Sequence, residues 1–471
     1  MTLVHTAGTE PGLPAPTAAP APGPVPGPAP ALRTAPEDPA VADAATVFVA
    51  TCDLAGQVRG RAVPGSDHAS ALRSGTGWVP VDLAISSFGP IAPDNVFGSR
   101  GDLRLVPDPA TGVDIPADGD HPALRLYLAD QTLPDGEPWP CCPRTFLRGA
   151  VEELRERTGL DVTASIEHEF VLGGLPSSPP FSLARYRHAE PFGSDLVRLL
   201  EQNGLQPENW LPEYGDGQFE ITLRPGTAMA AADRAVLLKE LVRDLARRRG
   251  LPVSFAPLLT PDGVGNGVHL HLSLRDAEGR PVLFDASRPG RLSALGARFS
   301  AGILRHTPAL TAWTAPSPVS FLRLTPHRWS AGGIFLAERN RESLLRICPT
   351  TQLAGADPAV QFNLEYRAAD ATANPWLALG VLIRAGLEGL VRDYDEPTVW
   401  PEDTDASVLA GVPALPASLE EALHALEADD VVRSWFDPRL LATHLSVKRS
   451  ELAQLAGLDE AARIRKVADV H

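Results

Sequence analysis

The sequence predicts an α+β protein with a small, strand-rich N-terminal domain followed by a larger domain of mixed helices and strands. First, 471 residues are too many for one core when domains average roughly 100–200 residues. Second, short apolar runs separated by Gly, Pro and Asp fill the N-terminal part. Third, helix and strand patterns follow each other later without the regular alternation of a TIM barrel. We expect a leader at residues 1–40, a first domain at 41–142 and a second domain at 143–471.

The elements follow from local patterns. In the first domain, short apolar runs at 46–52, 56–63, 78–85, 103–106 and 124–128 indicate strands and turns. The second domain opens with a helix at 144–157, because Pro143 precedes an apolar face and Gly159 follows it. Further strands are expected at 162–172, 217–223 and 267–274, helices at 228–249, 373–391, 419–426 and 440–455, and a loop at 397–416.

Composition indicates a globular protein and excludes several classes of function. Hydrophobic residues make up 44% and charged residues 21%, but the leader is rich in Pro and Ala and is expected to stay disordered. The net charge of −16 disfavours binding to nucleic acid. Only three lysines occur and no P-loop motif is present, so a phosphate would have to be held by arginine or a metal ion.

The four cysteines are scattered, so we expect neither a disulfide framework nor a zinc-finger site. The sequence has no signal peptide and no long apolar run, so we expect a soluble, cytoplasmic protein without a membrane partner.

Two carboxylates in the strand at 162–172 are the first candidates for chemistry. Glu167 and Glu169 are two residues apart, so both project from the same face of the strand. Two adjacent anions repel, and burying them is costly unless a cation compensates. The pair therefore favours a metal site, although a solvent-exposed charged face is the simpler alternative.

Later segments add more groups of the same kinds. Carboxylates with imidazoles suit Mg²⁺ or Mn²⁺, and arginines suit carboxylate and phosphate oxygens. Together they are typical of phosphoryl transfer, which suggests an ATP-using ligase. The added residues are Glu213, Glu220, His269, His271, Arg323, Arg341, Arg346, Glu365 and Arg367.

The order of these motifs resembles the glutamine synthetase family from about residue 46 to the C-terminus. The resemblance rests on Ile166-Glu-His-Glu-Phe170, Gly217-Gln-Phe-Glu220, Gly267-Val-His-Leu-His271, Asn340-Arg341 with Arg346, and Glu365-Tyr-Arg367 with Ala373-Asn-Pro-Trp-Leu377. It implies a β-grasp-like N-terminal domain, a catalytic domain built on a curved antiparallel sheet, and an assembly of two stacked hexameric rings. It also implies ATP and two or more Mg²⁺ or Mn²⁺ ions.

The resemblance assigns roles to these residues. Glu169, Glu213 and Glu220 would bind the first metal ion (the first metal set), and Glu167, His269 and Glu365 the second (the second metal set). The amino-acid substrate would contact Arg323, Gly265, Asn266 and Glu169. Arg341, Arg346 and Arg367 would act on the transferring phosphate and the γ-carboxylate. Nucleotide phosphates would contact His271, Ser273, Arg341 and Arg346.

Two departures from the family pattern concern the nucleophile. Ammonia-using members carry a flap glutamate where this chain has Trp329, and an indole takes up no proton. Their ammonium-binding Asp-Gly-Ser-Ser segment is missing, with Asp82 as a loose substitute. We therefore predict a γ-glutamyl amide formed from glutamate and an organic amine other than ammonia, through γ-glutamyl phosphate, with Trp329 shaping an apolar amine pocket. Polyamines are less favoured, because a dication requires acidic groups.

Three alternatives stay open. The protein could be a glutamine synthetase that uses ammonia. It could be an inactive structural or sensing relative, which is disfavoured because no predicted metal ligand is lost. A zinc amidohydrolase built on His269 and His271 would need a later carboxylated lysine, and the mid-chain Lys239 precedes the histidine pair.

Overall fold

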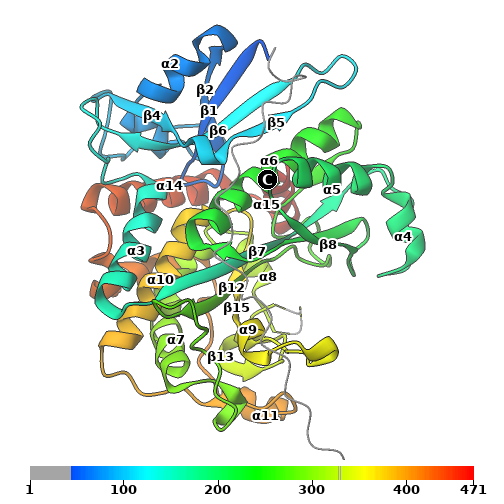
Figure 1. The fold of residues 1–471 in the computed structure, drawn as a ribbon, viewed down its shortest axis with the longest axis vertical. Helices are drawn as coiled ribbons and strands as arrows, with labels where there is room; N and C mark the ends of the chain where they lie inside the picture. The colour runs from blue at the N-terminus through cyan, green and yellow to red at the C-terminus, as the bar shows by residue number, and fades with distance from the viewer. Residues whose placement is uncertain (1–43, 327, 329) are drawn as a thin grey trace, which may run out of the picture.

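The computed structural model describes residues 44–326, 328 and 330–471 (Figure 1). Both the expected leader and Trp329 lie outside these residues.

The first domain is a sheet with one short helix, drawn blue and cyan at the top of Figure 1. Among the described residues it has six strands in the order β2-β1-β6-β4-β3, with β5 paired to β6 and β1 parallel to β6. The run at 78–85 is mostly a turn, because Pro80 begins a 3-10 helix, η2 (Pro80–Ala84). The strands are β1 (Thr46–Cys52), β2 (Val58–Pro64), β3 (Thr76–Trp78), β4 (Leu103–Pro107), β5 (Val113–Ile115) and β6 (Leu124–Thr132), and the helix is α2 (His68–Ser74).

A second, larger sheet forms the centre of the rest of the chain. Within the described ranges it has ten strands, ordered β16-β13-β14-β15-β12-β7-β9-β8, with β10 and β11 paired to β7. It is antiparallel from β14 to β8 as expected, but β13 pairs in parallel with β14 and β16. The strands are β7 (Asp161–Leu172), β8 (Pro207–Pro212), β9 (Gln218–Leu223), β10 (Gly226–Thr227), β11 (Val253–Ser254), β12 (Val268–Arg275), β13 (Gly333–Glu338), β14 (Ser343–Ile347), β15 (Leu364–Ala369) and β16 (Val399–Trp400).

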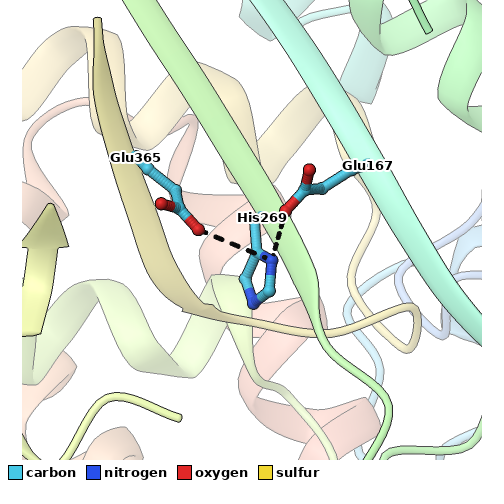
Figure 2. A group of neighbouring side chains, drawn as sticks. All are labelled: Glu167, His269 and Glu365. Atoms are coloured by element: carbon cyan, nitrogen blue, oxygen red, sulfur yellow. Dashed lines mark hydrogen bonds and ion pairs between the residues drawn. The ribbon is translucent and has the colours of Figure 1, made fainter. Parts of the chain in front are cut away.

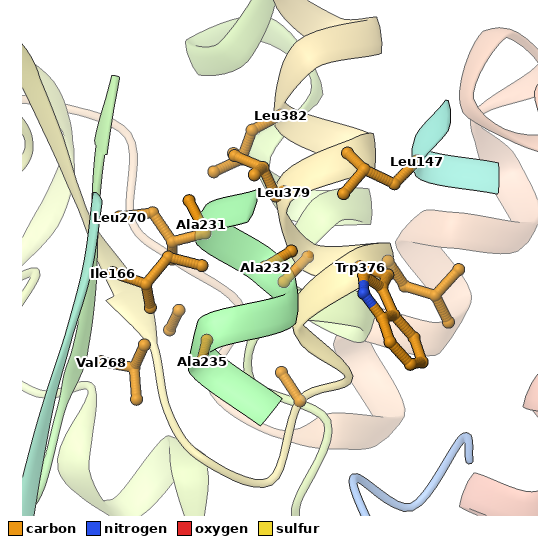
Figure 3. Close-up of a cluster of buried hydrophobic side chains, with 14 of the residues drawn as sticks. Leu147, Ile166, Ala231, Ala232, Ala235, Val268, Leu270, Trp376, Leu379 and Leu382 are labelled. Atoms are coloured by element: carbon orange, nitrogen blue, oxygen red, sulfur yellow. The ribbon is translucent and has the colours of Figure 1, made fainter. Parts of the chain in front are cut away.

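Helices cover one face of this sheet. Alternation in β7 and β12 turns Ile166, Val268 and Leu270 toward small side chains of α6 (Ala228–Arg248) and large ones of α10 (Pro375–Val391), as Figure 3 shows. Burying each of these aliphatic side chains contributes roughly 1.5–3 kcal/mol. Glu167 and Glu169 project from the opposite face, whereas His168 is buried on the helix side with Ile166.

All five expected helices are present within a few residues of their predicted bounds. The sequence analysis missed the others, of which the longest is α7 (Ala294–Thr314); it carries Pro308 inside the helix. The second domain opens with α3 (Pro143–Thr158), which ends at Gly159 in the left-handed region, with φ of 72°. The remaining helices are α4 (Leu183–His188), α5 (Phe192–Gln202), α8 (Ser320–Arg323), α9 (Pro358–Gln361), α11 (Ala406–Leu409), α12 (Leu419–Ala428), α13 (Asp430–Arg433), α14 (Pro438–Leu455) and α15 (Glu460–Ala468).

Among the described helices, none combines the length and hydropathy that crossing a membrane requires. All four cysteines are buried and free, as expected for a chain without a disulfide framework.

Candidate active site

Seven of the predicted site residues form a row across the face of the second sheet that lies opposite α6 and α10. Strand register sets this row, because residues directly opposite each other in a ladder have neighbouring side chains. The pairs across successive ladders are Glu220–Glu169, Glu167–His269, His271–Glu365 and Glu365–Arg346.

The second metal set converges at the centre of this row. Figure 2 shows Glu167, His269 and Glu365 pointing toward one another from β7, β12 and β15. His269 Nδ1 lies 2.5 Å from Glu167 Oε1 and 3.6 Å from Glu365 Oε1. One ligand atom from each residue lies within 4.8 Å of the other two, so the three could hold one divalent ion.

Positive groups surround the second metal set. Glu365 is 1% exposed and contacts Arg367 and, at 2.8 Å, Arg346. Burial opposes ionisation of Glu365, but Arg367 and His269 outweigh it and hold its pKa at about 2. Likewise, His271 and His269 outweigh the effect of burial on Glu167 and hold its pKa well below the usual range. Both carboxylates are therefore ionised at neutral pH.

The first metal set has the opposite electrostatics. Glu169, Glu220 and His269 each offer a ligand atom within 4.8 Å of the others. Burial, followed by repulsion from Glu167 and Glu169, raises the pKa of Glu220 to about 10. Carboxylates that resist ionisation together are the arrangement that a divalent cation relieves, so the residues fit a metal ion.

Glu213 is brought to this region but not into that tight group. It lies on the turn between β8 and β9, and its Oε2 accepts a hydrogen bond from the backbone nitrogen of Tyr214 at 3.0 Å. Burial, followed by Glu169, raises its pKa. Where the sequence analysis grouped Glu213 with Glu169 and Glu220, the structure places His269 within ligand distance instead.

The residues expected to bind the amino acid also lie together. Arg323 is 3% exposed, and its guanidinium donates to the Ala369 carbonyl at 2.6 Å. A Cβ on Gly265 would lie 2.4 Å from Arg323 Cγ, so only glycine permits this approach. Asn266 is buried and donates to the Ala256 carbonyl at 2.9 Å, which fixes the segment beside Arg323.

The other predicted site residues are more dispersed. Arg341 has an exposed side chain, while its carbonyl accepts a hydrogen bond from Arg367 at 2.9 Å. Ser273 is buried on β12, and its hydroxyl has no hydrogen-bond partner among the described residues. Asp82 lies on η2 of the first domain, where its charged neighbours are Arg61 and Arg59, so within this chain it is not brought to the metal-ligand row.

Several residues at the site were missed by the sequence analysis. The Gln218 amide lies between Glu169 and the loop at Gly265. Arg185 is 4% exposed and donates to the carbonyls of Glu213, Tyr214 and Gly215 at 2.5, 3.2 and 2.5 Å. Gln218 lies in the motif Gly217-Gln-Phe-Glu220, two residues before a predicted metal ligand, and that position was a usable signal. Nothing in the sequence around Arg185 indicates its contacts.

A cysteine and an asparagine contact residues at the second metal set. Cys348 Sγ lies 3.5 Å from Glu365 Oε2, and Asn363 Oδ1 lies 2.9 Å from His271 Nδ1. The neutral amide thus fixes the orientation of the imidazole ring that faces Glu167.

Comparisons with known proteins agree with the fold and the motifs. A family model described as the glutamine synthetase catalytic domain matches residues 140–466, and one described as the glutamine synthetase N-terminal domain matches residues 34–139. The gamma-glutamylpolyamine synthetase GlnA3 of Streptomyces coelicolor is 37% identical over 433 residues, covering 88% of this chain and 91% of that protein. The glutamine synthetase of Pyrococcus furiosus is 32% identical over 401 residues, covering 82% of this chain and 85% of that protein.

A solved structure gives the same result. The crystal structure described as a novel glutamine synthase homolog has a TM-score of 0.84 at 44% identity, covering 90% of this chain and 98% of that chain. The expected α+β fold, with a small N-terminal sheet domain and a larger glutamine-synthetase-type domain, is confirmed. The chain belongs to the glutamine synthetase family of ATP-dependent ligases.

Proposed function

We propose that the protein joins glutamate to an organic amine other than ammonia, forming a γ-glutamyl amide through γ-glutamyl phosphate at the expense of ATP. The observation that carries the proposal is the row of carboxylates and imidazoles on one sheet face, beside Arg323, Arg346 and Arg367. Divalent Mg²⁺ or Mn²⁺ is the proposed ion, since carboxylate oxygens, which suit both, are most of the ligands.

Each group of residues has a proposed role in this reaction. Glu167, His269 and Glu365 would hold a divalent ion, which when bound neutralises charge on the nucleotide phosphates. Arg346 and Arg367 are both fixed by Glu365, so their guanidinium groups are preorganised for the oxygens of the transferring phosphate and the γ-carboxylate. Arg323, packed against Gly265, would bind the α-carboxylate of the acid. The amine nitrogen then attacks the acyl phosphate carbon and phosphate leaves.

The identity of the amine rests on two different lines of support. Trp329 replaces the family's flap glutamate and favours an apolar, weakly basic amine that needs little deprotonation. The relative named as a gamma-glutamylpolyamine synthetase, 37% identical, favours a polyamine as the second candidate.

An amine panel tests the proposal. Phosphate release is measured with ATP, Mg²⁺ or Mn²⁺, and glutamate against ammonia, ethanolamine, putrescine, alkylamines and anilines, with methionine sulfoximine as inhibitor and mass spectrometry of the product. We expect turnover with one class of organic amine. Turnover with ammonia alone would refute the choice of nucleophile, and no nucleotide hydrolysis with any pair would favour the inactive alternative.

Two further measurements address the remaining parts. The Trp329→Glu variant is expected to gain ammonia-dependent turnover relative to the unmodified enzyme. Light scattering of the purified protein tests the proposed assembly of two stacked hexameric rings.

A further inference from the structure

We propose that Gln218 is a positioning residue that couples the first metal set to the loop that receives the amino-acid substrate. This inference rests on the proposed function, because it assigns a metal ion and an acid to the two groups that Gln218 joins.

The Gln218 amide makes contacts on three sides. It is the first residue of β9 and is 1% exposed. Its Nε2 donates to the Gly265 carbonyl at 3.0 Å and to Asn266 Oδ1 at 2.9 Å, and lies 3.5 Å from Glu169 Oε2. Its Oε1 accepts from the Gly215 backbone nitrogen at 2.9 Å.

The surroundings fix the orientation of this amide. All three neighbours of Nε2 are hydrogen-bond acceptors, while the neighbour of Oε1 is a backbone N–H. Rotating the amide by 180° would place its oxygen against three acceptors in a buried site. Gln218 therefore holds one orientation and links Glu169, the turn that carries Glu213, and the loop at Gly265 and Asn266.

A second contact joins the same two groups. Glu169 Oε2 also accepts a hydrogen bond from the Gly267 backbone nitrogen at 2.7 Å. A Cβ on Gly267 would lie 3.1 Å from an Arg323 nitrogen and 3.6 Å from Glu169 Oε2, so the loop packs between the arginine and the carboxylate. The position of Glu169 and the shape of the loop therefore depend on each other.

This arrangement predicts reciprocal coupling. An ion that draws Glu169 and the Glu213 turn into place also orders the loop, so the acid binds more tightly when the metal is present. By linkage, the acid tightens metal binding by the same factor.

The test measures binding rather than turnover. Mn²⁺ affinity is measured by electron paramagnetic resonance of the free ion, with and without saturating glutamate, and glutamate affinity by calorimetry with and without Mn²⁺. In the wild type we expect each ligand to tighten the other by at least about fivefold. In Gln218→Met, which keeps the side chain's length but loses its hydrogen bonds, the factor should fall clearly below the wild-type value, because only the contact between Glu169 and the Gly267 backbone nitrogen then joins the two groups.

Two variants separate positioning from a merely structural role. Gln218→Glu keeps an oxygen that accepts from the Gly215 backbone nitrogen, but it places a carboxylate oxygen against the Gly265 carbonyl and Asn266 Oδ1. This variant should bind Mn²⁺ at least as tightly as wild type and should lose affinity for glutamate. Gln131→Met changes another glutamine that is 1% exposed, whose Nε2 contacts Thr51 in the first domain, and should leave the coupling unchanged.

The outcomes are distinguishable. If Gln218→Met binds both ligands and keeps the wild-type coupling, the inference is wrong. If wild type binds Mn²⁺ but no glutamate, the proposed substrate is wrong instead. Should Gln218→Met fail to fold by circular dichroism, Gln218→Glu decides: equal losses of metal and acid affinity would overturn the proposal, and selective loss of acid affinity would support it.

Discussion

The two metal sets lie side by side on one sheet and have opposite electrostatics. In the second set, Glu365 contacts two arginines and Glu167 contacts two imidazoles, and both carboxyl pKa values are lowered. In the first set, Glu213 and Glu220 are half-buried near other carboxylates, and both pKa values are raised. In one half of the site cationic neighbours keep the carboxylates ionised, and in the other half Glu213 and Glu220 resist ionisation.

The difference indicates what each half needs. Arginine and histidine partners keep the carboxylates of the second set ionised, so the integrity of this set depends on those contacts. In the first set the pKa values of Glu213 and Glu220 are raised, so metal binding there releases a proton. Breaking the second set should therefore damage the protein, whereas changing the first set should damage only metal binding.

The largest effect is expected for Glu365→Gln. The change keeps the side chain's shape but leaves the buried Arg346 and Arg367 without their shared counter-charge. We expect turnover to fall by about 10²–10³-fold and the free energy of unfolding to fall by about 3 kcal/mol. Phosphate release and urea unfolding measure the two effects.

The matched control is Glu388→Gln on α10, where a buried glutamate pairs with Arg392 outside the site. It should cost stability and keep turnover. Wild-type stability in Glu365→Gln would contradict the dependence of the second set on its arginine and histidine partners.

Glu220→Gln should affect metal binding at the first metal set without affecting metal-free stability. Because the raised pKa keeps the Glu220 carboxyl protonated without metal, an amide mimics it, and metal-free stability should change by less than about 0.5 kcal/mol. The stabilisation by Mn²⁺ should shrink and turnover should fall by about 10–100-fold. Thermal unfolding with and without Mn²⁺ measures this. Glu208→Gln, at an exposed position of β8, is the control, and a large loss of metal-free stability in Glu220→Gln would refute the interpretation.

The pH dependence gives a third test. The Glu220 pKa is raised from 4.5 to about 10, so the folded metal-free state keeps a proton that the unfolded chain loses. Its contribution to stability is therefore complete below about pH 4.5 and is lost as pH rises toward 10. Glu365 has the opposite sign: its contribution is present above pH 4.5 and is lost as pH falls toward 2.

The affinity for metal should depend on pH because of the same Glu220 proton. Because Mn²⁺ displaces the proton of Glu220, the affinity of the protein for Mn²⁺ should rise by up to about tenfold per pH unit between roughly pH 6 and 8. Titrations at three pH values measure the slope. Glu220→Gln should flatten it, and an equal slope in that variant would assign the proton to another group.

Side-chain alternation was enough to predict much of this site. The pattern at 162–172 placed Glu167 and Glu169 on one face, and the structure has them there because Ile166 and its alternating neighbours pack against helices. Glu365 and Arg367, two residues apart on β15, share a face for the same reason and form an ion pair. These predictions hold because strand geometry is local.

Contacts between distant segments were not predictable in this way. That Glu220 lies opposite Glu169 is set by the β7–β9 register, which no local pattern encodes. That His269 offers a ligand atom within 4.8 Å of Glu169 and Glu220, while Glu213 lies nearby on the turn, depends on three strands and that turn. Asp82 was named only as a loose substitute for the family's ammonium-binding segment, and its role stays a prediction; within this chain its charged neighbours are Arg61 and Arg59.

The smallest effect is expected for Arg185→Lys, which probes the turn on the first-set side. Arg185 donates to three successive carbonyls at 213–215 and also to the Ser178 carbonyl, a fork that a lysine ammonium reproduces only in part. The turn should loosen around Glu213, lowering Mn²⁺ affinity by about 3–10-fold while the second set keeps its stability. Arg187→Lys, exposed on the same helix, should bind Mn²⁺ as wild type does. If both variants bind Mn²⁺ equally well, the turn is fixed by other contacts, and Glu213 contributes little to the charge that distinguishes the first set from the second.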